Sequence, residues 1–173
     1  MSEAITILVA DDDPRMLVLT TEVLGEAGYE VLQASNGKEC LEALKAHHPD
    51  IVLLDVMLPD TTGIELCRQI KADERLQGIF VILFSGVQVS SDYQADALNA
   101  GADGYIVKSV SNKELLARVQ SAVRIKRMVD ALREKEKEQQ KLILELQAAL
   151  AESKLQDGFV PMSELSTIIK KVT

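Results

Sequence analysis

Residues 51–60 read Ile-Val-Leu-Leu-Asp-Val-Met-Leu-Pro-Asp, an apolar run that stops at the carboxylate of Asp55. A run of this kind is typical of a central strand in a parallel sheet, since such a strand is covered on both faces. Asp55 then falls at the carboxyl end of the strand, where open α/β sheets bind their ligands. The stretch predicts a buried strand that presents Asp55 at the ligand-binding edge of a sheet.

Strands and helices are expected to alternate on both sides of this stretch. Four more apolar runs predict strands, at residues 5–10, 29–34, 79–84 and 104–107. Amphipathic stretches between the runs predict helices, at residues 14–27, 38–47, 64–72, 92–100 and from 112 onward. Five strand–helix units with right-handed crossovers predict an α/β fold with a flavodoxin-like, doubly wound, five-stranded parallel sheet in strand order 2-1-3-4-5.

Capping residues mark the predicted helix ends. Asp13 is expected to cap the first helix, with Pro14 at its first position and Gly28 just after its end. Pro49 is expected to end the second helix, and Ser111 to cap the last one. These signals support the helix assignments independently of hydrophobic periodicity.

Polar side chains follow the other predicted strands as well. Asp11 and Asp12 follow the first strand, Ser85 ends the fourth and Lys108 follows the fifth. Because the carboxyl ends of parallel strands meet at one edge, these side chains should converge on Asp55. Clustered carboxylates need a counter-charge, and Mg²⁺ binds carboxylates while leaving room for phosphate oxygens. A carboxylate beside a metal can act as a nucleophile and form an aspartyl-phosphate.

Each of these residues has a simpler interpretation when it is taken alone. The aspartates after the first strand are compatible with helix capping, and Asp55 with an ordinary turn residue. Lys108 is compatible with a solvated surface lysine, and Ser85 alone is uninformative. Their joint placement at the ends of successive strands favours a shared site, in which Lys108 would neutralise one phosphate oxygen and Ser85 would donate a hydrogen bond to another.

Together with two further stretches, these motifs resemble the receiver domain of bacterial response regulators. The stretches are Met-Leu-Pro-Asp-Thr-Thr-Gly at 57–63 and Gly-Ala-Asp-Gly-Tyr-Ile-Val-Lys at 101–108. The resemblance covers about residues 4–125. It implies that Asp55 is the phosphoacceptor, with Asp11 acting largely through water. It also implies that Mg²⁺ is bound by Asp11, Asp12, Asp55 and the backbone carbonyl of Met57, and that Ser85 and Tyr105 form the switch pair.

The sequence departs from the family pattern at two places. The family usually has proline after the lysine, often with a cis bond, whereas Ser109 follows Lys108 here. A non-proline cis bond costs about 3–4 kcal/mol, so either this bond is trans or the loop carries strain. The loop Asp60-Thr61-Thr62-Gly63 stands where a glycine and an apolar residue are more usual. We expect this second difference to alter the surface more than the chemistry.

The last helix has no stop signal until Asp157-Gly158. A heptad frame places Ala122, Val129, Glu136, Ile143 and Leu150 at position a. It places Ile125, Leu132, Gln139, Leu146 and Ser153 at position d. The apolar majority predicts a short coiled coil with a polar break. A lone solvated helix is the simpler alternative, but exposed apolar stripes usually have partners.

The expected organisation is a receiver domain at 1–125, a coiled-coil extension of the last helix at 126–156, and a short tail at 157–173, with a helix expected at 162–172. We expect a phosphorylation-controlled switch that receives its phosphoryl group from a histidine kinase or phosphotransfer protein and forms a homodimer through the helical tail. Its activity would be limited to self-phosphorylation from a donor and autodephosphorylation.

Two alternative functions remain, an aspartyl-nucleophile phosphohydrolase and a phosphorylation-independent dimerising scaffold. Met57 disfavours the phosphohydrolase, because haloacid-dehalogenase-like enzymes have an acid at that position.

Charge and hydropathy argue against two further classes of function, nucleic-acid binding and membrane insertion. The net charge of −8 and the lack of a basic stripe argue against direct nucleic-acid binding. No apolar run reaches the roughly 18 residues of a membrane span, and no basic leader precedes the first strand. We therefore expect a cytoplasmic protein with no membrane contact.

Overall fold

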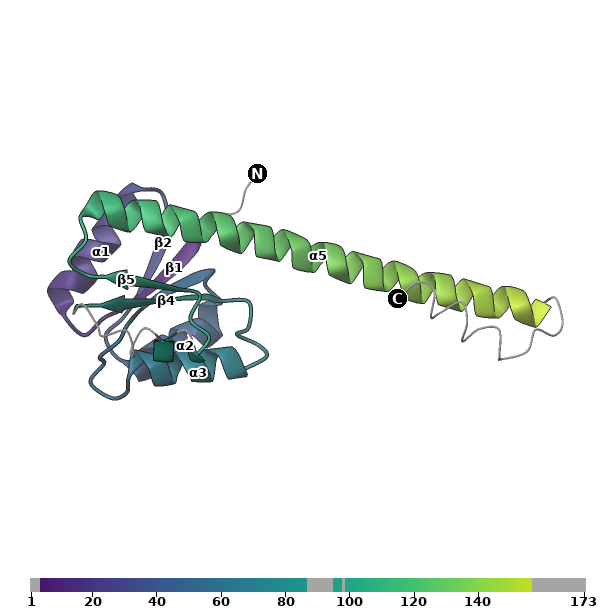
Figure 1. Cartoon of the computed structure of the whole chain (residues 1–173), viewed down its shortest axis with the longest axis horizontal. Coiled ribbons are helices and arrows are strands. Elements are labelled where there is room, and N and C mark those ends of the chain that lie inside the picture. The colour runs from purple at the N-terminus through teal and green to yellow at the C-terminus, as the bar shows by residue number, and fades with distance from the viewer. Residues whose placement is uncertain (1–3, 87–94, 98, 157–173) are drawn as a thin grey trace. The chain divides into compact units, whose positions relative to one another are not determined.

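The computed structural model describes residues 4–86, 95–97 and 99–156, and their core is a five-stranded parallel sheet (Figure 1). The strands are β1 (Thr6–Ala10), β2 (Glu30–Ala34), β3 (Ile51–Asp55), β4 (Phe80–Ser85) and β5 (Gly104–Val107). Their order is β2-β1-β3-β4-β5, and every neighbouring pair is parallel. The predicted flavodoxin-like topology is confirmed, and β3 lies at the centre of the sheet.

Four helices have defined bounds in the described residues. They are α1 (Pro14–Glu26), α2 (Gly37–His47), α3 (Gly63–Ala72) and α5 (Asn112–Gln156). The helix predicted at 92–100 lies partly outside the described residues, of which 95–97 and 99 are helical. The C-terminal tail at 157–173, with its predicted helix, lies outside them entirely.

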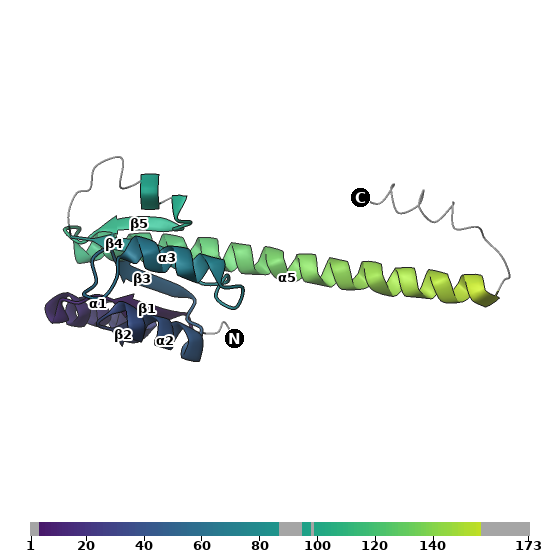
Figure 2. The same ribbon diagram turned by 90° about the horizontal axis from the view of Figure 1, so that it is seen from below.

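Helices cover the sheet on both faces, with α1 and the first part of α5 on one side and α2 and α3 on the other (Figures 1 and 2). Side chains alternate along each strand, so every inner strand contributes to two cores. The core under α2 and α3 includes Leu8, Val52, Leu54, Val81 and Leu83. The core under α1 and α5 includes Ile7, Ile51, Leu53, Ile82 and Phe84. This double burial explains the unbroken apolar run at the centre of the sequence.

The helix ends follow the capping signals. The Asp13 carboxylate accepts an amide hydrogen bond at the start of α1, and Gly28, with φ of +88°, follows its end. The Ser111 hydroxyl likewise accepts an amide hydrogen bond in the first turn of α5. Helix α2 ends at His47, as predicted. His48, the residue before Pro49, leaves the helical conformation and adopts a left-handed one with φ of +47°.

Helix α5 belongs to two compact units, residues 1–128 and 129–173. In the first unit Val119, Ala122 and Val123 are buried in the sheet core. Lys126 is also buried, and its Nζ lies 4.0 Å from Asp50 Oδ1. Ala122 is therefore already packed within its own domain and cannot serve as the first core position of a coiled coil.

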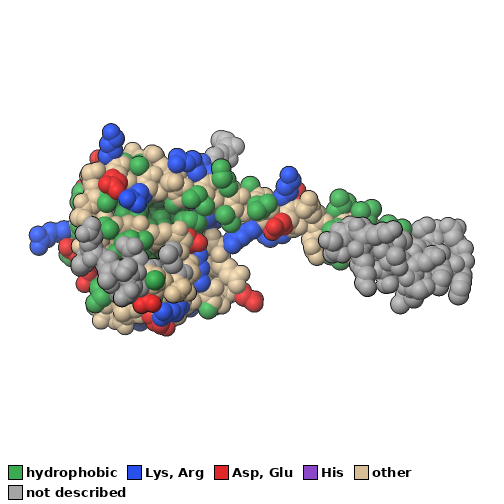
Figure 3. All heavy atoms as spheres, viewed as in Figure 1, with side chains coloured by type: hydrophobic (Ala, Val, Ile, Leu, Met, Phe, Trp, Pro, Cys, Tyr) green, Lys and Arg blue, Asp and Glu red, His purple; other side chains and the backbone are tan. Residues whose placement is uncertain are grey.

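In the second unit, large apolar side chains of α5 are exposed. Leu132 is 59% exposed, Ile143 41% and Leu146 55%. Figure 3 shows apolar side chains at the surface of α5 with charged ones between them. None of the helices in the described part of the chain is both long and apolar enough to cross a membrane.

Candidate functional site

Four charged side chains meet at the carboxyl end of the sheet. Asp11 and Asp12 follow β1, Asp55 is the last residue of β3, and Lys108 follows β5. Oxygens of the three carboxylates lie within 4.8 Å of one another. The Lys108 Nζ lies 2.6 Å from Asp11 Oδ2 and 2.7 Å from Asp55 Oδ2. Residues from three strands, up to about a hundred positions apart, are thus brought to one place by the parallel topology.

Burial makes the charges of this cluster interdependent. Asp11 is fully buried and Asp55 nearly so, whereas Asp12 is exposed. Burial raises the pKa of Asp11 above its usual range, although the Lys108 ammonium opposes that effect. Burial alone would lower the pKa of Lys108, but Asp11 and Asp55 outweigh it and raise that pKa. Lys108 therefore stays cationic, and three ionised carboxylates with one ammonium carry a formal charge of −2.

The donor set fits a divalent cation with oxygen ligands. The Oδ1 atom of Asp11 accepts the amide of Asp13 at 3.0 Å. Its Oδ2 atom is buried and, although at ion-pair distance from Lys108, has no hydrogen bond of good geometry. Such an oxygen keeps lone pairs for another partner, and leaving it unsatisfied is costly. A cation of charge +2 would balance the cluster, and Mg²⁺ prefers carboxylate oxygens with water and phosphate in the remaining positions.

The loop between β3 and α3 adds a backbone group to the cluster. The amide of Met57 donates to Asp55 Oδ1 at 3.2 Å, which orients the carboxylate. Met57 and Thr62 are paired in an isolated antiparallel bridge. The two hydrogen bonds of this bridge are made by the residues that flank Met57 and Thr62 in the sequence, not by Met57 and Thr62 themselves. The carbonyl of Met57 thus remains outside that ladder, while its side chain is 66% exposed. The backbone of Met57 is thus adjacent to the Asp55 carboxylate.

Ser85 lies next to Lys108 at the end of β4, and Tyr105 lies on the adjacent strand β5. Ser85 is the buried last residue of β4, and its carbonyl accepts the amide of Lys108 at 2.6 Å. In the strand register Tyr105 pairs with Leu83, two residues before Ser85, so both side chains belong to the same face of the sheet. No peptide bond among the described residues is cis, and the Lys108–Ser109 bond is therefore trans. Of the two alternatives left by the missing proline, the trans bond is the one found.

The polar residues in the β3–α3 loop form hydrogen bonds with the starts of two helices. The carboxylate of Asp60 accepts the amides of Gly37 and Lys38 at the start of α2, at 2.8 and 2.9 Å. These hydrogen bonds, that of Gly37 foremost, lower the pKa of Asp60. The hydroxyl of Thr62 caps α3. An acidic residue in a loop hints at capping, but its partner across 23 residues cannot be identified from local pattern.

Fold and site together define an α/β domain with an acidic cluster at the carboxyl edge of its central strands, and comparison with known proteins supplies the family. The family model "Response regulator receiver domain" matches residues 7–120. The chain belongs to the response-regulator receiver family.

Known relatives match about two thirds to three quarters of this chain. The phosphate regulon transcriptional regulatory protein PhoB of Pseudomonas aeruginosa is 39% identical over 69% of this chain and 52% of its own length. The DNA-binding response regulator MtrA of Mycolicibacterium smegmatis is 37% identical over 68% of this chain and 50% of its own length. A CheY-like receiver domain protein from Methanospirillum hungatei has a TM-score of 0.68 at 31% identity, covering 73% of this chain and 98% of that structure.

This chain spans about half the length of the curated relatives that it matches. Two of them are named as a transcriptional regulator and as a DNA-binding protein. Those names conflict with our expectation of no direct nucleic-acid contact, which therefore stays a prediction for residues 1–173 alone.

Proposed function

We propose that the protein is a phosphorylation-controlled switch of a two-component system, with Asp55 as the phosphoacceptor. The observation that carries the proposal is the contact of the Asp55 carboxylate with Lys108, beside Asp11 and Asp12. Incubation with acetyl phosphate and Mg²⁺, followed by intact-mass measurement, tests it. One phosphoryl group adds about 80 Da as a covalent aspartyl-phosphate. Absence of any mass gain at saturating donor would contradict the proposal.

The proposed reaction transfers a phosphoryl group to one carboxylate oxygen of Asp55. That oxygen attacks phosphorus as the bond to the donor breaks, which is a P–N bond in phosphohistidine and a P–O bond in acetyl phosphate. The leaving group takes the bonding electrons and, for phosphohistidine, a proton from solvent. Bound Mg²⁺ would neutralise phosphate oxygens. Lys108, held at 2.7 Å from Asp55, is placed to pair with another of them.

The donor that we propose is a histidine kinase or a phosphotransfer protein, as the receiver family implies. The protein itself then contributes self-phosphorylation and autodephosphorylation and has no separate substrate. The exposed thioether of Met57, two residues after Asp55, offers no acid for a dehalogenase-like phosphohydrolase. Ser85 and Tyr105, on one face of adjacent strands, are the proposed switch pair. A cytoplasmic location is part of this proposal.

Mg²⁺ affinity should depend on Asp12 and hardly at all on its neighbour Asp13. Replacing Asp12 by Asn removes the negative charge of a proposed metal ligand and leaves only a neutral amide oxygen, and we expect an affinity loss of about tenfold or more. Asp13→Asn is the matched control, because it removes an adjacent charge while asparagine preserves the helix cap. Titration calorimetry with MgCl₂ measures both. Equal affinities in the two variants would contradict the metal site.

The same titration should depend on pH in a defined direction. Burial raises the pKa of Asp11, so protons compete with the metal at higher pH than they would at an exposed aspartate. Mg²⁺ affinity is therefore expected to start falling at a higher pH than at a site of exposed aspartates. An affinity that stays constant down to about pH 4, where an exposed aspartate is half protonated, would exclude Asp11 from the site.

We further propose that the tail of α5 joins two copies of the chain as a parallel coiled coil. Val129 and Ile143 at position a, with Leu132 and Leu146 at position d, follow the pattern of β-branched a and leucine d residues that favours two parallel strands. All four side chains are at least 36% exposed in the single chain. A second copy would cover them. Because Ala122 is buried in the receiver, the coil begins at or beyond Ile125.

The seam, formed by the a and d positions that would face the partner helix, can be tested against a control on the same turn of the helix. Ile143 and Leu146 lie on the seam, whereas Leu144 lies at position b and is equally apolar and 59% exposed. We expect the double variant Ile143→Lys, Leu146→Lys to sediment as a monomer, since charge at both core positions abolishes the apolar contact. Leu144→Lys should remain dimeric. A monomeric unmodified chain, or dissociation caused equally by both changes, would contradict the coiled coil.

A further inference from the structure

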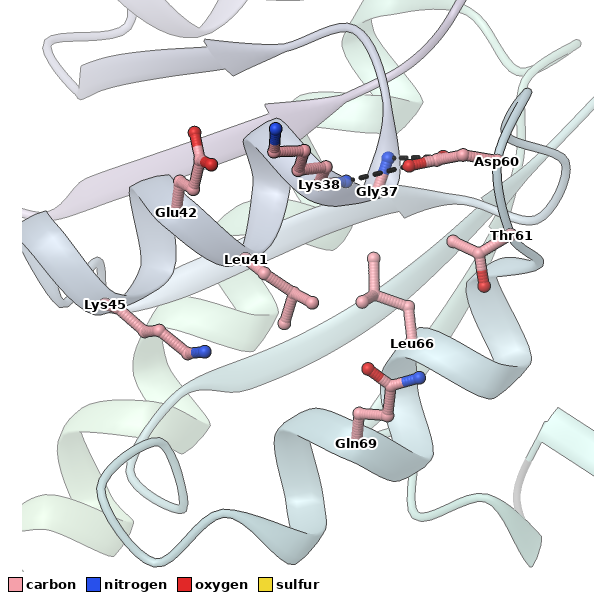
Figure 4. A pocket seen from close by; sticks show the side chains of 9 residues that line it. All are labelled: Gly37, Lys38, Leu41, Glu42, Lys45, Asp60, Thr61, Leu66 and Gln69. Atoms are coloured by element: carbon pink, nitrogen blue, oxygen red, sulfur yellow. Dashed lines mark hydrogen bonds between the residues drawn. The ribbon is translucent and has the colours of Figure 1, made fainter.

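The start of α2 and the loop after β3 are joined by one side chain. Asp60 Oδ1 accepts the amide of Gly37 at 2.8 Å, and Asp60 Oδ2 accepts the amide of Lys38 at 2.9 Å (Figure 4). The third amide of the helix, that of Glu39, is bound instead by the side chain of Asn36 at 2.8 Å. Helix α2 therefore has two caps of different origin: Asn36 belongs to its own chain segment, and Asp60 comes from the β3–α3 loop.

The loop is also seated closely against the helix. Gly37 is buried, and a Cβ atom on it would lie 2.4 Å from Thr61 Cγ2 and 3.1 Å from Asp60 Oδ1. Real Cβ atoms essentially never lie within 3.0 Å of another heavy atom of this kind, so Gly37 is the residue that lets the loop approach. Hydrogen bonds and close packing thus fix the same two loop residues, Asp60 and Thr61, on the first turn of α2.

This fixed point is directly connected to the phosphorylation site. The carbonyl of Thr61 accepts the amide of Leu58 at 3.1 Å, which closes the loop on itself. Met57, the residue before Leu58, donates its amide to Asp55 Oδ1. From Asp60 to Asp55 the path consists of one short loop and two hydrogen bonds, from the Leu58 amide to the Thr61 carbonyl and from the Met57 amide to Asp55 Oδ1.

We propose that Asp60 is a positioning residue for the phosphorylation site, holding the loop from which Met57 presents its backbone to Asp55 and to the metal. The inference rests on the proposed phosphorylation of Asp55. A loop held at one end only samples more conformations, and misplacement of a reacting group by about 1 Å can cost about a hundredfold in rate. Asp60 makes no contact with the reacting atoms in this proposal and acts through the loop alone.

The experiment compares two variants that weaken the same helix in different ways. Asp60→Ala removes the cap provided by the loop. Asn36→Ala removes the local cap, whose hydrogen bond to Glu39 stays within the start of α2. Both are expected to lower the unfolding midpoint by a similar amount, about 2–8 °C for the loss of one cap. Asp60→Asn retains one acceptor oxygen while losing the charge, so it separates hydrogen bonding from electrostatic effects on the acidic cluster.

Two readouts distinguish positioning from stability. Hydrogen exchange of the Leu58 and Gly63 amides, followed by NMR, reports the loop without phosphorylation. The initial rate of labelling by acetyl phosphate with Mg²⁺ reports the site. Asp60→Ala should exchange these amides at least about tenfold faster and label about tenfold more slowly than Asn36→Ala, with Asp60→Asn between Asp60→Ala and the unmodified chain.

Identical exchange and labelling in Asp60→Ala and Asn36→Ala would overturn the inference. Asp60→Asn behaving like Asp60→Ala in labelling, with unchanged loop exchange, would also overturn it in favour of a purely electrostatic effect. A failure of the proposed function is distinguishable from either result, because the unmodified chain would then show no labelling at all while the exchange comparison still reports the loop.

Discussion

Replacing Asp55 by Asn is expected to abolish phosphoryl labelling completely. Asparagine keeps an acceptor for the Met57 amide but has no carboxylate to attack phosphorus, and it removes one of the two negative partners of Lys108. The mass increase of about 80 Da produced by acetyl phosphate and Mg²⁺ in the unmodified chain should therefore be absent. Intact-mass spectrometry at several incubation times measures the effect.

Asp13→Asn is the control for this variant. It removes a carboxylate just beside the cluster and preserves the cap of α1, so it should label at close to the rate of the unmodified chain. Labelling of Asp55→Asn at an undiminished rate would show that another residue accepts the phosphoryl group. Asp11 and Asp12 would then be the next candidates.

Replacing Gly63 by Ala is expected to have the next largest effect, on stability and on phosphorylation together. A Cβ atom at Gly63 would lie 2.2 Å from the backbone oxygen of Asp55 and 3.0 Å from Val56 Cα. These are backbone atoms that cannot rotate away, so the loop and the end of β3 must separate. We expect the free energy of unfolding to fall by about 3 kcal/mol, as in other overpacked sites. Displacement of Asp55 should also slow labelling by about tenfold or more.

Gly25→Ala provides the matched comparison. Gly25 also lies in a helix, and nothing stands within 4 Å of the Cβ that the substitution would add. Alanine there should stabilise the protein by about 0.5–1 kcal/mol and leave labelling unchanged. Urea unfolding of both variants measures the difference. Equal stabilities of the Gly63 and Gly25 variants would mean that the loop is not packed against β3 in the way described.

The topology was predictable because the chain marks its strands clearly. Apolar runs at regular spacing identify parallel strands buried on both faces, and Asp13, Gly28 and Ser111 mark helix ends as expected. Pro49 likewise follows the end of α2 at His47. The left-handed conformation of His48 is not predictable from residue type, since histidine adopts positive φ far less readily than glycine.

The site was predictable in its strand-end residues, because topology alone brings Asp11, Asp55 and Lys108 together. The contribution of Asp60 was not predictable, since it depends on the distance between a loop and a helix that are separate in sequence. The residue at which the coiled coil begins was not predictable for a similar reason. Heptad periodicity continues back to Ala122, but whether that side chain faces its own sheet or a partner depends on how α5 packs.

The central claim concerns one carboxylate, so locating the label in the unmodified chain tests it most directly. The phosphorylated protein can be reduced with borohydride, which converts an aspartyl-phosphate to homoserine, and then cleaved after lysine and arginine. Fragmentation of the peptide spanning residues 46–68 distinguishes Asp55 from the other two aspartates it contains, Asp50 and Asp60. The change is expected between Leu54 and Val56 and nowhere else. Modification at Asp11, Asp12 or any other carboxylate, with Asp55 intact, would contradict the account.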